Sequence, residues 1–302
     1  MIDPKFLEDY EFATSGARIA PLVDWSTVII SGADRASFLH NMCTNDIRSL
    51  APGGEREAFI CDVKGKIVGH VLVFNQPEKL LLGTVPGQAE KLIAHLDRYI
   101  ITEDVKLTDA TTDLAWWVLI GPNVTDASGN ALQILWPGGI LGASPRDQPP
   151  ETYGAAVGDG VWNTLRIESG LPLFGVDFDE SNLPQEVGRN SQAINFRKGC
   201  YLGQETIARI DALGHVNKQL ATVKFAGDEP PAPGAELTAG GQAVGRVTSA
   251  CWSPTLECGL GLAMLRRGFF EPGAKLECAG GSAEVVATPA VAHSDPRPRA
   301  GG

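Results

Sequence analysis

The chain has 302 residues, of which 43% are hydrophobic and 20% charged, enough for a real core and for two or three compact units. Its formal net charge of -11 argues against nucleic acid and anionic membrane surfaces as partners, because both are bound through Lys and Arg. The N-terminus carries Asp3, Glu8 and Asp9 without an apolar signal region, and the longest apolar run, 114–120, is too short to cross a bilayer. We therefore expect a cytoplasmic protein without a nucleic-acid or membrane partner.

The first half of the chain mixes short apolar runs with isolated helical segments. Strands are predicted at residues 27–30, 56–62, 67–75, 80–84 and 114–120. A short helix is expected after Asp34, and an amphipathic helix over 87–97. The glycine-containing segment 63–66 predicts a hairpin between two of the strands. Hairpins combined with single helices indicate an α+β fold rather than a parallel sheet.

The second half changes character near residue 217. Residues 142–152 read as a surface loop, 161–170 as ordered, and 204–212 as a helix that Gly214 ends. Short apolar runs separated by Gly and Pro then predict a small β-barrel or sandwich. We predict a first region at 1–218, a C-terminal β-barrel at 219–289 and a disordered tail at 290–302.

The six cysteines give no sign of a metal site. They form no C-x-x-C pair and no Cys/His cluster of zinc-finger spacing, so we expect free thiols in a reducing compartment. Five of them are interpreted as small buried hydrophobes. Cys200 differs, because Gly199 and Gly203 flank it, Arg197 and Lys198 precede it and a helix is expected just after it. These neighbours favour a thiolate, and Cys200 is therefore the candidate reactive residue.

The segment around Cys200 is also basic. Its cations are Arg189, Arg197, Lys198, Arg209 and Lys218, and its only acids are Glu205 and Asp211. In an acidic protein this reversal fits a pocket for an anionic small molecule. A solvated helix face is the alternative, which charge alone leaves open.

The motif Lys-Gly-Cys-Tyr-x-Gly-Gln-Glu at 198–205 resembles the signature of YgfZ-type folate-binding proteins, relatives of the glycine-cleavage T-protein (aminomethyltransferase). Blocks at 32–46, 166–177 and 245–254 resemble further family elements in the same order. The resemblance covers most of the chain. It implies a three-subdomain ring around a central channel that binds tetrahydrofolate. Greek-key and ferredoxin-like parts would interleave in the N-terminal region, followed by the C-terminal β-barrel.

The resemblance also implies roles for single residues. Glu168 matches the carboxylate that binds the pterin, and a carboxylate suits that role because it accepts two parallel N–H bonds. The alternative for Glu168 is a surface ion pair with Arg166, which is itself counted among the folate contacts. Lys198 and Arg197 would contact the folate carboxylates. Gln204 would bind ligand or cap the following helix.

The resemblance leaves two alternatives open for two further arginines. Arg189 and Arg209 would serve a polyglutamate tail or only the surface.

One departure from the T-protein pattern bears on function. T-proteins carry adjacent acidic residues in the strand matching 67–73, where this chain has Gly69 and His70. His70 would serve as an acid or base or be structural. We therefore expect a folate-dependent accessory factor for iron–sulfur proteins, with such proteins as clients. The alternatives are an aminomethyltransferase or demethylase, and a module that has lost its ligand.

Overall fold

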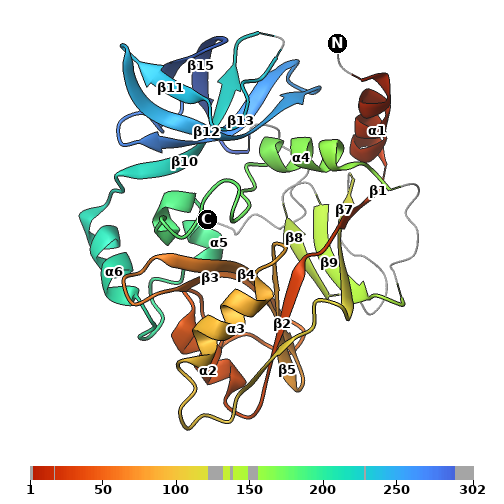
Figure 1. Ribbon diagram of the computed structural model, residues 1–302, viewed down its shortest axis with the longest axis vertical. Coiled ribbons are helices and arrows are strands. Elements are labelled where there is room, and N and C mark those ends of the chain that lie inside the picture. The colour runs from red at the N-terminus through yellow and green to blue at the C-terminus, as the bar shows by residue number, and fades with distance from the viewer. Residues whose placement is uncertain are drawn as a thin grey trace, which may run out of the picture.

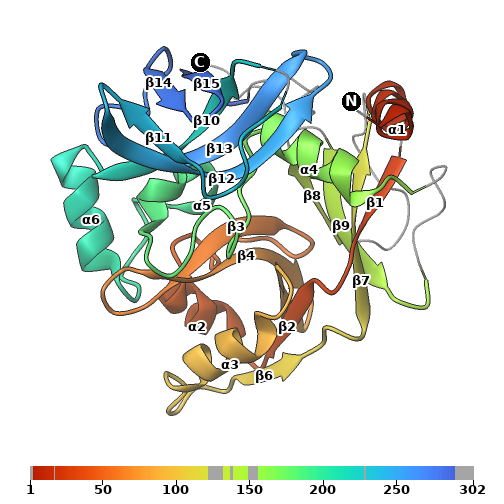
Figure 2. The same ribbon diagram turned by 45° about the horizontal axis from the view of Figure 1, so that its top comes forward.

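The computed structural model describes residues 3–16, 18–121, 132–136, 139–148, 156–227 and 229–289. Two antiparallel sheets and a closed barrel surround helix α4 and the segment that follows it (Figures 1 and 2). The predicted α+β class and the C-terminal barrel are confirmed. The tail at 290–302, predicted to be disordered, lies outside the described residues.

The first sheet joins segments that are far apart in the sequence. Its strand order is β1-β7-β9-β8, with bounds Arg18–Leu22, Leu114–Ile120, Gly139–Pro145 and Leu132–Trp136. Helices α1 (Pro4–Ser15) and α4 (Asp159–Glu168) pack on it through a shared apolar cluster that includes Tyr10, Trp116 and Leu165. The prediction of a loop at 142–152 was wrong for its first residues, because 142–145 pair with 114–117 in the sheet.

The second sheet contains the predicted hairpin. Its order is β3-β4-β5-β2-β6, with bounds Glu55–Cys61, Ile67–Gln76, Lys79–Thr84, Ser26–Ser31 and Lys106–Asp109. Helices α2 (Arg35–Met42) and α3 (Ala89–Asp97) cover one face around Leu39, Leu82 and Leu92. The turn between β3 and β4 contains Gly65 at a φ of 76°, a conformation that favours glycine.

The segment between α4 and the barrel covers the other face of the second sheet. It contains the 3-10 helix η1 (Pro184–Val187) and helices α5 (Asn190–Ala193) and α6 (Gln204–Leu213). Apolar side chains that include Phe59, Phe178 and Ile207 pack between this segment and the sheet. Helix α6 confirms the prediction at 204–212, and Gly214 ends it in the left-handed conformation, with a φ of 69°.

The barrel is built from six strands in the closed order β10-β13-β12-β11-β14-β15. In chain order their bounds are Lys218–Phe225, Glu236–Ala239, Gln242–Ser253, Cys258–Arg266, Lys275–Cys278 and Gly281–Val286. Helix α4 lies against strands β12 and β13, between the barrel and the first sheet (Figure 1). Among the helices that the structure describes, none has the length and apolar character needed to cross a bilayer.

Candidate functional site

Glu168 is the last residue of α4, and its side chain has no exposed area. The Tyr10 hydroxyl donates to the carboxylate at 2.9 Å from Oε1 and 2.8 Å from Oε2. The Ser253 hydroxyl, from strand β12, donates to Oε1. The carboxylate is therefore covered by hydroxyl donors from α1 and the barrel. The alternative of a surface ion pair is wrong, because Glu168 is fully buried.

Tyr10 links three parts of the chain at this carboxylate. Burial, the largest effect, raises the pKa of its hydroxyl, and the charge of Glu168 raises it further, so Tyr10 remains a proton donor. Its oxygen also lies 2.7 Å from Thr255 Oγ1, in the turn between β12 and β13. A phenol has one proton, so Thr255 donates to Tyr10 while Tyr10 donates to Glu168.

Arg166 lies two residues before Glu168 in α4 and is bonded to Asp177 and Ser249. Its Nη1 pairs with Asp177 Oδ2 at 2.9 Å, and its Nη2 donates to the Ser249 hydroxyl at 2.6 Å. Asp177 also accepts a hydrogen bond from Ser249. This buried group ties α4 to strand β12 and so holds Glu168 in place against the barrel.

Lys198 is buried and donates to backbone carbonyls at the end of helix α2. Its Nζ contacts the oxygens of His40, Cys43 (2.8 Å) and Asn45 (2.8 Å). Burial, the largest effect, lowers the pKa of Lys198. An ammonium has three protons, so these carbonyls use its donor capacity. The His40 carbonyl belongs to the last turn of α2, whose carbonyls lack partners within the helix, and Cys43 and Asn45 follow that helix. Lys198 thereby ties the 195–203 segment to the loop after α2.

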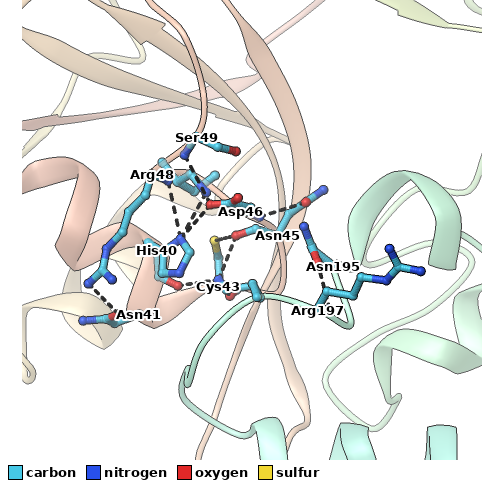
Figure 3. A network of polar contacts seen from close by, with 11 residues as sticks. His40, Asn41, Cys43, Asn45, Asp46, Arg48, Ser49, Asn195 and Arg197 are labelled. Atoms are coloured by element: carbon cyan, nitrogen blue, oxygen red, sulfur yellow. Dashed lines mark hydrogen bonds and ion pairs between the residues drawn. The ribbon is translucent and has the colours of Figure 1, made fainter.

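The loop after α2 carries a second set of polar contacts, which Figure 3 shows. His40 Nδ1 lies 3.1 Å from Asp46 Oδ1 and accepts from the backbone N–H groups of Ile47 and Arg48. Burial lowers the pKa of His40, so the ring is neutral at neutral pH and the contact with Asp46 is not an ion pair. These contacts shape the loop that receives Lys198.

The other residues predicted from the motif lie near the surface. Arg197 and Cys200 are exposed, and the Arg197 side chain extends away from the His40–Asp46 contact (Figure 3). Gln204 is half-buried and begins α6. Gly203 has a φ of 81°, and a Cβ there would lie 2.4 Å from the Asp62 carbonyl oxygen. Glycine at 203 thus allows the Cys200 segment to pack on the β3–β4 turn.

A buried ionic group surrounds His70 on the inner face of the second sheet. His70 Nε2 lies 2.8 Å from Glu57 Oε1, and Arg189 pairs with both oxygens of Glu57. Burial raises the pKa of Glu57, but Arg189 and then His70 lower it to about 2. The His70 ring stacks on Phe59 at 5.0 Å between centroids. The carboxylate that the strand of His70 lacks is therefore present on the neighbouring strand, neutralised by Arg189.

The remaining cysteines fit the interpretation as small hydrophobes only in part. Cys43, Cys61, Cys251 and Cys258 are buried, whereas Cys278 is half-exposed. Burial and then the charge of nearby Glu168 raise the pKa of Cys251 to about 12, so its thiol stays protonated. Within the described ranges, no group of three or more His, Cys, Asp and Glu residues is arranged to hold a metal ion.

Sequence patterns gave no signal for Tyr10, which donates to Glu168, or for Thr255, which contacts the Tyr10 hydroxyl. For Glu57 a signal existed: it is the acidic residue that directly precedes the apolar run Ala58–Cys61 of the same strand. The predicted residues themselves form two groups. Arg166 and Glu168 face the barrel, whereas Lys198 contacts the loop after α2.

Two family descriptions match the chain. The GCVT N-terminal domain matches residues 9–133, and the glycine cleavage T-protein C-terminal barrel domain matches residues 218–292. An aminomethyltransferase from Frankia alni is 30% identical over 281 residues, which are 80% of this chain and 76% of that protein.

Two other similarities add to these matches. A mitochondrial protein of Mycosarcoma maydis, named as a homologue of the iron–sulfur cluster assembly factor IBA57, is 28% identical over 241 residues, 71% of this chain and 59% of its own length. The crystal structure of the glycine cleavage system aminomethyltransferase T from Bartonella henselae has a TM-score of 0.83 at 17% identity, covering 95% of this chain and 90% of that one. The chain spans only part of the length of such relatives, from 59% of the Mycosarcoma maydis protein to 83% of an aminomethyltransferase from Caldanaerobacter subterraneus.

Proposed function

Because this chain belongs to the glycine cleavage T-protein family, we propose that it binds a reduced folate at Glu168 and acts as an accessory factor for iron–sulfur proteins. The observation that supports the folate site is the buried carboxylate of Glu168, whose oxygens accept hydrogen bonds from Tyr10 and Ser253. Tetrahydrofolate, when bound, would supply a carrier for one-carbon units.

The donor set around Glu168 fits a pterin. The 2-amino and ring N–H groups of a pterin are neutral donors, the same kind of group that the hydroxyls of Tyr10 and Ser253 present to the carboxylate. A pterin N–H pair therefore replaces a hydroxyl donor without leaving a buried acceptor unsatisfied. Arg166 supports the site by bracing α4 through Asp177.

For the glutamate end of folate, the structure favours Arg197 over Lys198. Lys198 already donates to buried carbonyls, whereas Arg197 is exposed three residues before Cys200. A guanidinium also binds a carboxylate through two parallel hydrogen bonds. We propose Arg197 as the contact for the folate carboxylates, Lys198 as a positioning residue for the Cys200 segment, and Gln204 as the start of α6 beside it.

The iron–sulfur part of the proposal is supported by Cys200 and by the Mycosarcoma maydis relative. Cys200 is the exposed cysteine of the described residues and lies in a segment fixed by Lys198 and Gly203. Aminomethyl transfer is the second candidate, supported by the aminomethyltransferases among the relatives. Against it, Glu57 is held by Arg189, so this carboxylate is poorly placed to take up a proton.

We expect Glu168→Gln to weaken tetrahydrofolate binding by about 10- to 100-fold, because the amide replaces a charged acceptor of the pterin N–H groups with a weaker acceptor and a competing donor. Isothermal titration of the purified variants measures this. Glu205→Gln, an exposed change at the start of α6, is the matched control and should bind like the wild type. The folate proposal fails if wild type does not bind tetrahydrofolate, and the assignment to Glu168 fails if the variant binds equally well.

We expect Cys200→Ser to reduce the activity of radical iron–sulfur enzymes to the level of a deletion strain when cells are under oxidative stress, because serine lacks a thiolate. Cys278→Ser, a change at a half-exposed cysteine of the barrel, is the control. When it is expressed in the deletion strain, it should restore the activity of the radical iron–sulfur enzymes to the wild-type level. Equal activity with both variants would contradict the role of Cys200. Formation of methylene-tetrahydrofolate from a glycine-derived donor by the purified protein would instead favour the transferase.

A further inference from the structure

Helix α1 covers the carboxylate of Glu168, which is the proposed binding group for the pterin. The Tyr10 hydroxyl lies within 2.9 Å of both oxygens of Glu168, which is the edge that a pair of ligand N–H groups needs. Since Glu168 has no exposed area, a ligand cannot reach it until a neighbouring group moves.

Of the two hydroxyl donors to Glu168, Tyr10 can be displaced with less disturbance of the fold than Ser253. Ser253 belongs to strand β12 of the closed barrel, is paired with Cys258 and accepts from the Leu256 N–H. Its movement would disturb the barrel. Tyr10 is carried by the terminal helix, which lies at the edge of the molecule in both views (Figures 1 and 2).

Helix α1 is anchored by three of its side chains. Tyr10 and Ala13 are buried and Phe6 packs half-buried on the same apolar cluster, whereas Leu7 and Phe12 are 39% and 47% exposed. Elements with few buried contacts have the lowest free energies of local opening. Displacement of α1 should therefore uncover Glu168 at a lower cost than displacement of Ser253, which belongs to the closed barrel.

From these observations we propose that Tyr10 gates the folate site, so that α1 withdraws the Tyr10 hydroxyl from Glu168 when a pterin binds there. The inference rests on the proposed folate site. Tyr10 brings one proton to the carboxylate, whereas the pterin edge brings two N–H donors, so the exchange favours a ligand with a two-donor edge. Thr255 is exposed, and water satisfies it when Tyr10 leaves. The gate thus selects against ring systems that lack the amino group.

Tyr10→Phe tests this proposal, because it removes the hydroxyl and keeps the ring in the apolar cluster. We expect the variant to bind tetrahydrofolate about tenfold more tightly than wild type in isothermal titration, since the ligand no longer competes with a hydrogen bond to a charged group. Tyr99→Phe, a change next to α3 in the second sheet's helical layer, is the control and should leave the affinity unchanged.

Hydrogen–deuterium exchange gives a second readout. Saturating tetrahydrofolate should speed exchange of the α1 amides in wild type, and in Tyr10→Phe these amides should exchange fast without ligand. Unchanged affinity in Tyr10→Phe, together with unchanged α1 exchange in the wild-type complex, would overturn the gate while leaving folate binding intact. No binding to either protein would overturn the proposed function and the gate with it. Binding to Tyr10→Phe alone would support a gate that is closed in the free protein.

Discussion

Replacing Arg189 with methionine should lower the free energy of unfolding at pH 7 by about 3–5 kcal/mol, because it leaves the Glu57 carboxylate buried without its main counter-charge. His70 remains beside Glu57 at 2.8 Å and compensates only in part. Urea denaturation followed by tryptophan fluorescence measures the loss. Arg209→Met removes an exposed arginine of α6 and is the control, with an expected change within about 0.5 kcal/mol.

The loss in Arg189→Met should depend on pH in a defined direction. Glu57 has a pKa of about 2 in the folded wild type, below the roughly 4.3 of an unfolded glutamate, so its stabilising contribution is present above that value and is lost as the pH falls toward 2. In the variant the lowering by Arg189 is absent, and burial raises the pKa of Glu57. The difference in the free energy of unfolding between wild type and variant should therefore become smaller as the pH falls from about 5 to about 3. A difference that stays constant over this range would contradict the assignment.

Lys198→Met should lower the free energy of unfolding by about 3 kcal/mol, because it leaves the carbonyls of His40, Cys43 and Asn45 without their buried charged donor. The positive charge also stabilises the C-terminal end of helix α2. Urea denaturation gives the magnitude, and Arg197→Met, which removes the exposed neighbouring charge, should change stability by less than about 0.5 kcal/mol.

A local readout separates a positioning role for Lys198 from general destabilisation. The backbone N–H groups of Asn195 and Leu202 donate to the carbonyls of Thr44 and Asn41, next to the Lys198 contacts. In Lys198→Met these two amides should exchange faster with deuterium, while amides of the barrel strands keep their wild-type order of protection. Equal acceleration across the whole chain would contradict a local role for Lys198.

The fold was largely predictable where local patterns and tertiary packing agree. Helix α6 ends at Gly214 as that glycine predicts, and the hairpin of β3 and β4 carries Gly65 at the turn. Strand β9 was missed because its residues 139–145 are rich in Gly, Ala, Ser and Pro. They form a strand because β7 lies beside them and pairs with all seven residues.

The sequence selected candidate residues for the site but could not give their contacts. Glu168, Lys198 and Cys200 were selected from the sequence because each stands in a recognisable motif. Whether a charge meets ligand, backbone or another charge depends on side chains that are distant in sequence. Glu168 meets Tyr10 from 158 residues away, and Lys198 meets His40 from the same separation.

By itself, the sequence determined the α+β class, the C-terminal barrel and the family of this protein, because strand periodicity, turn residues and ordered motifs are properties of neighbouring residues. Only the tertiary structure decided that Glu168 lies under Tyr10, that Lys198 holds a backbone loop and that Glu57 stands beside His70. A buried charge must find partners where water is excluded, and packing brings those partners from elsewhere in the chain.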